Sequence, residues 1–251
     1  MLFSKTFWLP VITLWQRELI RFWREKGRVL GFVGSPLIFW LVIGSGFGDL
    51  RFFFPGALIL TVMFSAVFST MSLIEDRREG FLLSMLVSPA PRSSMVLGKT
   101  LGSATLAWIQ GLMFLAFAPV AGVRLSLVGL IEVVAVLYLV SVTLTLLGFL
   151  VAWQMDSAQA FHAIINLVLV PLWMVSGSLF TMAKAHGWIR AVMTVNPLTY
   201  TVSALRWLLD PATGAETPGL ALSVAVVAAC GLALLAASAA VAGRKSSRNF
   251  A

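Results

Sequence analysis

The chain has 251 residues, of which 59% are hydrophobic and 11% are charged, and its mean hydropathy is +0.95. This composition excludes an ordinary soluble globular domain. Apolar runs of about 20 residues without strand-like alternation indicate membrane-spanning helices and argue against a β-barrel. The single cysteine, Cys230, excludes a disulfide framework and lies in an Ala-rich apolar run, where a packing role is expected.

Residues 1–28 predict a basic amphipathic helix that lies in the headgroup region. Apolar and aromatic side chains recur at three- and four-residue spacing from Trp8 to Trp23, while Arg17, Arg21 and Arg24 fall on the other side. Aromatic side chains favour the membrane interface, and cations favour anionic lipid. A soluble docking helix is the alternative. A signal peptide is not expected, because the basic region is too long and no apolar core directly follows the start of the chain.

Residues 29–251 predict an all-α membrane domain with six transmembrane helices. The expected spans cover 29–48, 54–74, 99–122, 127–152, 159–180 and 219–242. With the N-terminus in the cytosol, thirteen Lys and Arg fall on the cytosolic side and five on the outer side. This bias follows the positive-inside rule, predicts that both termini are cytosolic, and explains the net charge of +8 without a nucleic-acid partner.

The polar loop 75–98 interrupts the apolar first half of the chain and is expected in the cytosol, since its charges would be costly in lipid. The charged start and the glycine that follows it are Glu75, Asp76, Arg77, Arg78, Glu79 and Gly80. A short amphipathic helix follows, with one apolar face and two prolines that end it. That face comprises Phe81, Leu82, Met85 and Leu86, and the prolines are Pro89 and Pro91. Such a helix beside the membrane suits the docking of a soluble partner.

The sequence Gly98-Lys99-Thr100 looks like the end of a phosphate-binding P-loop, but the first glycine of that motif is replaced by Ser93 and no strand enters the loop. An ATP site is therefore not expected here. Lys99 is interpreted as the interfacial charge that starts the third span. Gly98 and Gly102 form a small-xxx-small pattern that allows another helix to approach closely.

Two stripes of polar side chains run along predicted spans. Thr61, Ser65, Ser69 and Ser72 lie along one face of the second span, and Gln159, His162 and Asn166 lie along the fifth. Both stripes could border a translocation path or a dimer seam. The alternative is hydrogen bonding within the bundle or back to the same helix.

The segment 181–218 predicts two short helices on the outer side, joined at Asn196-Pro197, that dip into the outer leaflet as a lid. Glu132 is the one acid that could serve a proton-coupled carrier, although it could equally sit at the outer interface. The residues offer no catalytic constellation and no cofactor or metal site, so catalysis by this chain is not expected.

Three features resemble the membrane-spanning permeases of type-2 ABC exporters, the group that includes drug-resistance, nodulation-factor and polysaccharide export permeases. The first is the central loop, with EDRREG, SMLVSPAPR and VLGK; the second is NPLTYTVSALR at 196–206; the third is a basic amphipathic N-terminal helix followed by six spans. Ser203 departs from the pattern, because many relatives carry an acid there.

The resemblance implies a plasma (inner) membrane half-transporter that pairs with a second copy or a related permease and with two separate ABC ATPase subunits. ATP and magnesium would bind to those subunits. The loop around 75–86 would be the ATPase-coupling helix, the second and fifth spans would line the dimer seam, and Asn196, Pro197, Tyr200 and Arg206 would belong to the outer hairpin. An ion-coupled carrier or channel and a membrane scaffold are the alternatives. The sequence leaves open the cargo and the choice between homodimer and heterodimer.

Overall fold

The computed structural model describes residues 5–24, 26–88 and 90–244, and within these ranges the chain forms helices and connecting loops without a strand. The helices are α1 (Lys5–Arg24), α2 (Lys26–Phe47), α3 (Leu50–Ser69), α4 (Ser72–Arg78), α5 (Phe81–Val87), α6 (Arg92–Leu115), α7 (Leu127–Gln154), α8 (Ala158–Trp173), the π-helical turn η1 (Met174–Ser178), the 3₁₀ turn η2 (Met182–Lys184), α9 (Gly187–Val195), α10 (Pro197–Leu209), α11 (Pro211–Gly214) and α12 (Leu220–Arg244). The predicted all-α class is therefore confirmed for the described residues.

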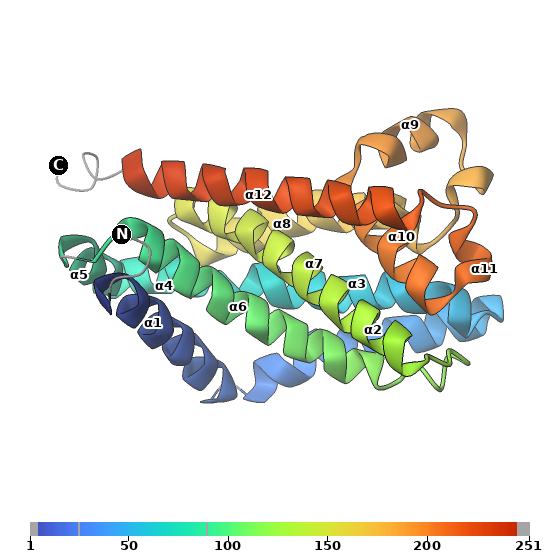
Figure 1. The fold of residues 1–251 in the computed structure, drawn as a ribbon, viewed down its shortest axis with the longest axis horizontal. Coiled ribbons are helices and arrows are strands. Elements are labelled where there is room, and N and C mark those ends of the chain that lie inside the picture. The colour runs from blue at the N-terminus through green and yellow to red at the C-terminus, as the bar shows by residue number, and fades with distance from the viewer. Residues whose placement is uncertain (1–4, 25, 89, 245–251) are drawn as a thin grey trace.

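Helix α3 forms the centre of an elongated bundle (Figure 1). It is apolar along nearly its whole length and packs against α2, α6, α7 and α10. Asp49 begins the helix, because its carboxylate accepts a hydrogen bond from the Phe52 N–H at 2.8 Å. Trp40 of α2 and Phe114 of α6 are fully buried against this core and contact each other edge to face.

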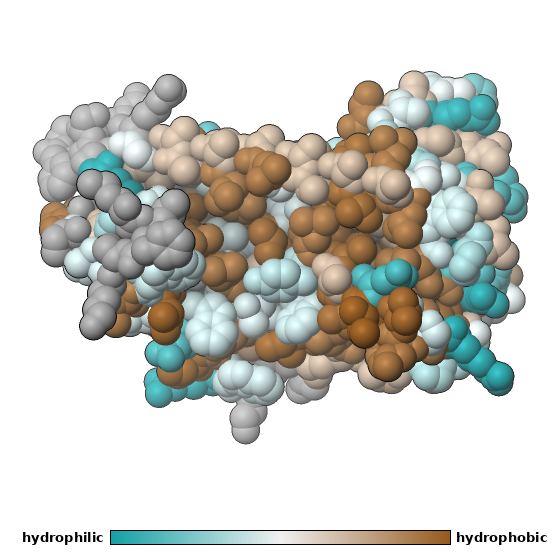
Figure 2. Space-filling view, viewed as in Figure 1, coloured by the Kyte–Doolittle hydropathy of each residue, from teal (hydrophilic) through white to brown (hydrophobic). Residues whose placement is uncertain are grey.

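The two ends of the bundle differ in what they carry. Helices α1, α4 and α5 lie at one end together with the C-terminal end of α12, and α9, α10 and α11 lie at the other (Figure 1). Hydrophobic residues cover most of the middle of the visible face, and hydrophilic residues gather mainly toward the ends (Figure 2). This pattern is typical of a protein that crosses a bilayer.

Within the described residues, four helical segments are long and apolar enough to cross a membrane: Leu50–Arg78, Leu127–Gln154, Ala158–Ser178 and Leu220–Gly243. The two other predicted spans match α2, whose apolar part, Gly31–Phe47, is shorter, and α6, which carries Arg92 and Lys99 in its first turns. The predicted count of six spans is thus not confirmed by length and composition alone.

Helix α10 is buried in the bundle, where it packs against α12, α7 and α3. The sequence predicted that both helices of the segment 181–218 would cover the bundle from outside. Only α9 has that exposed character: Trp188 and Val195 are 65% and 78% exposed. The two helices meet at Asn196, the predicted turn.

Candidate functional site

A cluster of buried charges joins α1, α4 and α6 at the end of the bundle that carries the polar loop. The ammonium of Lys99 donates to the Glu18 carboxylate at 2.6 Å, to the Ser72 hydroxyl at 3.1 Å and to the Asp76 carboxylate. Lys99 and Glu18 are each 3% exposed, and Asp76 is fully buried. The three donors of the ammonium therefore have three acceptors, which is the condition under which a buried cation is tolerated.

Two arginines of α1 complete this cluster. Arg17 makes a two-pronged hydrogen bond to Asp76, with distances of 3.0 and 2.7 Å, and this bond raises the pKa of Arg17 against the opposite effect of burial. Arg21 pairs with Glu75 and lies 3.4 Å from Asp76. Together with Lys99 and Glu18, the cluster contains three cations and three anions, so it is neutral overall.

Helices α1 and α6 can share this cluster because two glycines let them approach closely. A Cβ built on Gly98 would lie 3.0 Å from the Leu14 Cβ, and one built on Gly102 would lie 2.7 Å from the Glu18 Cβ. The small-xxx-small prediction for Gly98 and Gly102 is confirmed, and the helix that approaches is α1. Since Arg17 and Arg21 bind the carboxylates of α4, their predicted contact with anionic lipid is replaced by ion pairs within the protein.

Arg77, Arg78, Glu79 and Gly80 lie at the end of α4. Arg77 donates to the backbone oxygens of Trp153 (2.7 Å) and Met155 (2.8 Å) at the end of α7. A cation there satisfies carbonyls that the helix leaves without partners. Arg78, Glu79 and Gly80 are exposed. The φ of +76° at Gly80 reverses the chain before α5 and favours glycine at this position.

Helix α5 places its predicted apolar face toward the bundle. Leu82 is buried, and the ring of Phe81 lies 3.9 Å from the Arg17 guanidinium, a cation–π contact. The side chain of Leu86 lies outside the described residues. The opposite face of α5 exposes two large apolar side chains, Leu83 at 46% and Val87 at 67%.

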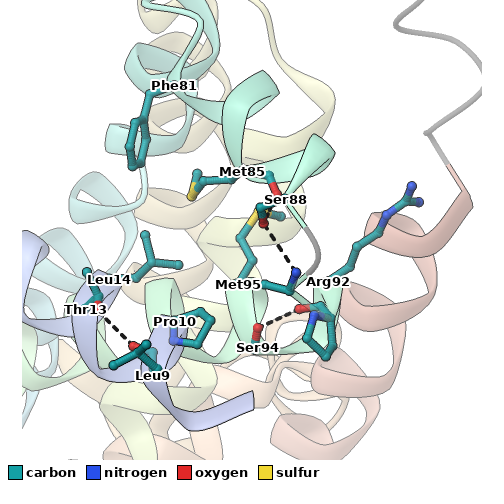
Figure 3. Close-up of a pocket in the computed structure, with 12 residues that line it drawn as sticks. Leu9, Pro10, Thr13, Leu14, Phe81, Met85, Ser88, Arg92, Ser94 and Met95 are labelled. Carbon is teal, nitrogen blue, oxygen red and sulfur yellow. Dashed lines mark hydrogen bonds between the residues drawn. The ribbon is translucent and has the colours of Figure 1, made fainter. Parts of the chain in front are cut away.

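A largely apolar pocket of about 280 Å³ separates α5 from α1 and from the start of α6. Figure 3 shows Met85 of α5 facing this space together with Leu14 of α1, while Arg92 points away from it. Arg92 instead donates to the backbone oxygen of Gly243 near the end of α12 at 2.8 Å. Helix α5 is thus seated over a hollow rather than packed tightly on α1.

The hydroxyl stripe of the second predicted span lies inside the single chain. Thr61, Ser65, Ser69 and Ser72 are all buried. Thr61 and Ser69 donate back to the carbonyls of Ala57 and Ser65, and Ser72 belongs to the charged cluster. Within the described part of the chain, the Ser65 hydroxyl has no hydrogen-bond partner. The stripe therefore presents no surface to a second copy in this arrangement.

The polar stripe of the fifth span lies on the partly exposed side of α8. Gln159 and Asn166 are exposed, and His162 is half-buried with its ring 4.5 Å from the ring of Phe68. The two stripes therefore differ in burial: the hydroxyls of α3 face the core, whereas the α8 side chains are exposed or half-buried.

The 196–206 motif stabilises the broken end of α8. The π-helical turn and Gly177, with φ of +90°, leave carbonyls there without helical partners. Asn196 donates to the Leu172 oxygen at 2.7 Å and caps α10 by accepting from the Leu198 N–H at 3.0 Å. Arg206 donates to the Gly177 oxygen at 2.8 Å. Both ends of the motif therefore hold α8 in place.

The remaining residues of this outer segment have supporting contacts. Tyr200 donates to the Thr194 oxygen at 2.8 Å, which joins α10 to α9. Pro197 is the first residue of α10, where a missing N–H costs nothing. Burial lowers the pKa of Arg206 to about 10 against the opposite effect of Asp210, and the Arg206 guanidinium lies 4.2 Å from the ring of Phe52.

The described residues contain no group of three or more His, Cys, Asp or Glu side chains that could hold a metal ion. Glu132 is exposed near the start of α7.

Glu18 is the functional candidate that sequence reasoning missed. Its signal was modest: a single acid between Arg17 and Arg21 on the polar side of an amphipathic helix. The sequence predicts an interfacial charge at Lys99, whereas the structure buries this side chain against Glu18, which lies 81 positions earlier in the chain. A contact over that distance cannot be read from local spacing.

The helical bundle, its apolar middle and its polar loop are those of an integral membrane protein. The family model for the ABC-2 type transporter matches residues 10–209. The chain belongs to this family and is a membrane permease component of an ABC transporter.

Three relatives are similar to this chain over most of its length. A putative transport permease, ycf38, of Cyanophora paradoxa is 26% identical over 212 residues, which cover 79% of this chain and 73% of the relative. The daunorubicin resistance ABC transporter permease protein DrrB1 of Streptomyces coeruleorubidus is 25% identical over 228 residues (84% and 78%). Nodulation protein J of Rhizobium leguminosarum bv. trifolii is 25% identical over 211 residues (78% and 79%).

Proposed function

We propose that this chain is the membrane-spanning subunit of an ATP-driven exporter, which works as a dimer and is coupled to two separate ABC ATPase subunits. ATP and magnesium bind to those subunits. The chain crosses the plasma membrane six times, with α2 and α6 as the two additional spans and with both termini in the cytosol. The family membership and the excess of Lys and Arg near α1, α4 and α5 support this proposal.

The ATPase docks on the outward face of α5. Leu83 and Val87 are exposed there although α5 has an apolar pocket beside it on its other face. Exposed apolar side chains next to exposed charges, here Arg78 and Glu79, are typical of a protein interaction site. This exposed pair is the observation that carries the docking proposal. The inward residues Phe81 and Leu82 anchor the helix to the bundle.

The charged cluster transmits movement of the docked helix to the bundle. Asp76 and Glu75 lie on α4, directly before α5, and their cationic partners lie on α1 and α6. A displacement of α5 therefore moves α4, and the ion pairs of Glu75 and Asp76 pass this movement to α1 through Arg17 and Arg21 and to α6 through Lys99. Ion pairs shared by three helices suit this purpose, because they resist separation of any one helix from the other two.

The dimer forms along α8. Gln159, His162 and Asn166 offer hydrogen-bonding groups on a partly exposed helix in the membrane, where such groups favour helix association. The hydroxyls of α3 are buried inside each copy and do not take part in this contact. The outer segment with Asn196 and Arg206 closes the opposite end of the path.

Docking is tested by co-purification of the full chain with its ATPase. Leu83→Asp and Val87→Asp remove apolar contacts without disturbing the buried face of α5, and we expect each to lower the yield of bound ATPase strongly. Val195→Asp is the matched control, because Val195 is equally apolar and 78% exposed at the opposite end of the bundle. Unchanged ATPase yield in both α5 variants would refute the assignment of this surface.

A further inference from the structure

A second apolar cavity of about 280 Å³ lies between α7, α8, α10 and α12, far from the polar loop. Its lining includes Leu144 and Leu147 of α7, Leu169 and Leu172 of α8, and Leu234 of α12. Helix α12 packs on α7 and α10 rather than on α8. We refer to this space as the α8–α12 cleft.

The cleft lies at the depth of the hydrocarbon core. With a rise of about 1.5 Å per residue, the 28-residue helix α7 is roughly 42 Å long, so Leu144 and Leu147 lie roughly 10–15 Å from its end and within a hydrocarbon core about 30 Å thick. Its lining residues on α12, from Val227 to Leu234, occupy the middle of that helix. Both helices are long and apolar enough to span the membrane. Ala233, which also lines the cleft, is exposed, and the medium around the bundle at this depth is the interior of the bilayer.

The walls offer nothing to a polar ligand. Thr143 donates to the carbonyl of Leu139 at 3.0 Å, and Thr201 donates to that of Leu198 at 2.7 Å, so both hydroxyls are already bonded. Ordered water occupies a buried cavity when polar groups in its walls lack hydrogen-bond partners, and both hydroxyls in these walls already have one. An apolar cavity that meets lipid at this depth is filled by hydrocarbon.

We propose that the α8–α12 cleft binds one acyl chain of a membrane phospholipid. Its volume lies just below the about 300–1,000 Å³ typical of sites for drug-sized molecules, which favours a single narrow chain over a bulky ring system. The polar residues of the α8 stripe, Gln159, His162 and Asn166, do not line the cleft. The acyl chain therefore does not compete with the proposed dimer contact.

The test uses the full chain in nanodiscs that contain phosphatidylcholine with a diazirine in the middle of one acyl chain. After illumination, adducts are mapped by mass spectrometry. We expect them on Leu169, Leu172 and Leu234, at several-fold higher yield than on the exposed Leu232, which does not line the cleft. Equal yields at all four positions would mean that only bulk lipid is sampled and would overturn the proposal.

Filling the cleft provides the second arm of the test. Cys230 lines it, so Cys230→Phe should lower the adduct yield on Leu169 and Leu172 several-fold. Ala236→Phe is the matched control, since Ala236 is exposed on α12 and does not line the cleft. If Cys230→Phe does not fold, Leu172→Trp fills the space from α8, with adducts read on Leu234.

Two outcomes of this second arm contradict the proposal. The first is an unchanged adduct yield on the cleft residues after the cleft has been filled. The second is a cleft that stays unlabelled because a second copy of the chain covers it, which cross-linking between copies would detect. No ATPase is present in this preparation, so its outcome is independent of the docking proposal.

Discussion

Loss of the Lys99 charge should release α1 from the bundle. Lys99→Met retains most of the side-chain volume but leaves Glu18 and Asp76 with fewer partners, and both carboxylates are almost completely buried. Removing one partner of a buried ion pair costs about 3–5 kcal/mol. We expect a loss of this size for Lys99→Met, with its largest effect on α1, which the cluster holds to α4 and α6.

Hydrogen–deuterium exchange of α1 in detergent measures this loss locally. Since each 1.4 kcal/mol corresponds to a factor of ten, a loss of at least 3 kcal/mol should speed opening of α1 amides about 100-fold or more. Asp156→Asn is the control, because Asp156 pairs with Arg77 at 2.9 Å but is 91% exposed. Such surface pairs are worth about 0–1 kcal/mol.

The double variant Glu18→Gln with Lys99→Met tests the reasoning about charge balance. It removes one cation and one anion, so the remaining cluster is again neutral, and we expect it to lose less than the sum of the two single changes. Strictly additive losses, or a loss for Lys99→Met no larger than that for Asp156→Asn, would refute the claim that Lys99 and Glu18 stabilise each other.

Two glycine substitutions test the close approaches of the fold. Gly102→Ala places a Cβ 2.7 Å from that of Glu18, so it should lower the free energy of unfolding by about 1–3 kcal/mol, whereas Gly34→Ala, with nothing within 4 Å, should be neutral or stabilising in denaturant titration. Gly177→Ala should lower the free energy of unfolding by about 1–3 kcal/mol through its φ of +90° alone, since the nearest atom to the added Cβ is 3.7 Å away. Gly187→Ala is the control, because nothing lies within 4 Å of that position. Equal melting temperatures for these two variants in thermal unfolding would contradict the prediction.

The order and position of the helices could be predicted from the sequence because hydrophobic periodicity and proline positions are local signals. The amphipathic N-terminal helix, the short helix after Gly80 and the turn at Asn196 appear at the expected places. The close contact at Gly98 and Gly102 was also predictable, since small residues four apart make a groove on any helix.

The partners of these elements were not predictable, because periodicity identifies a face without saying what packs on it. Thr61 and Ser69 share a helical face, but that face turns into the core and their hydroxyls bond to their own helix. Likewise, Phe81 and Leu82 share the apolar face of α5, and the structure turns this face inward while Leu83 points outward.

The central claim is that this permease is driven by an ATPase it does not contain. The direct measurement is affinity purification of the wild-type chain in mild detergent, with identification of co-purifying chains and an assay of ATP hydrolysis. We expect an ABC ATPase to co-purify and its turnover to be inhibited by vanadate. A preparation that lacks an ATPase, under conditions that preserve other ABC complexes, would contradict the claim and would favour an ion-coupled carrier.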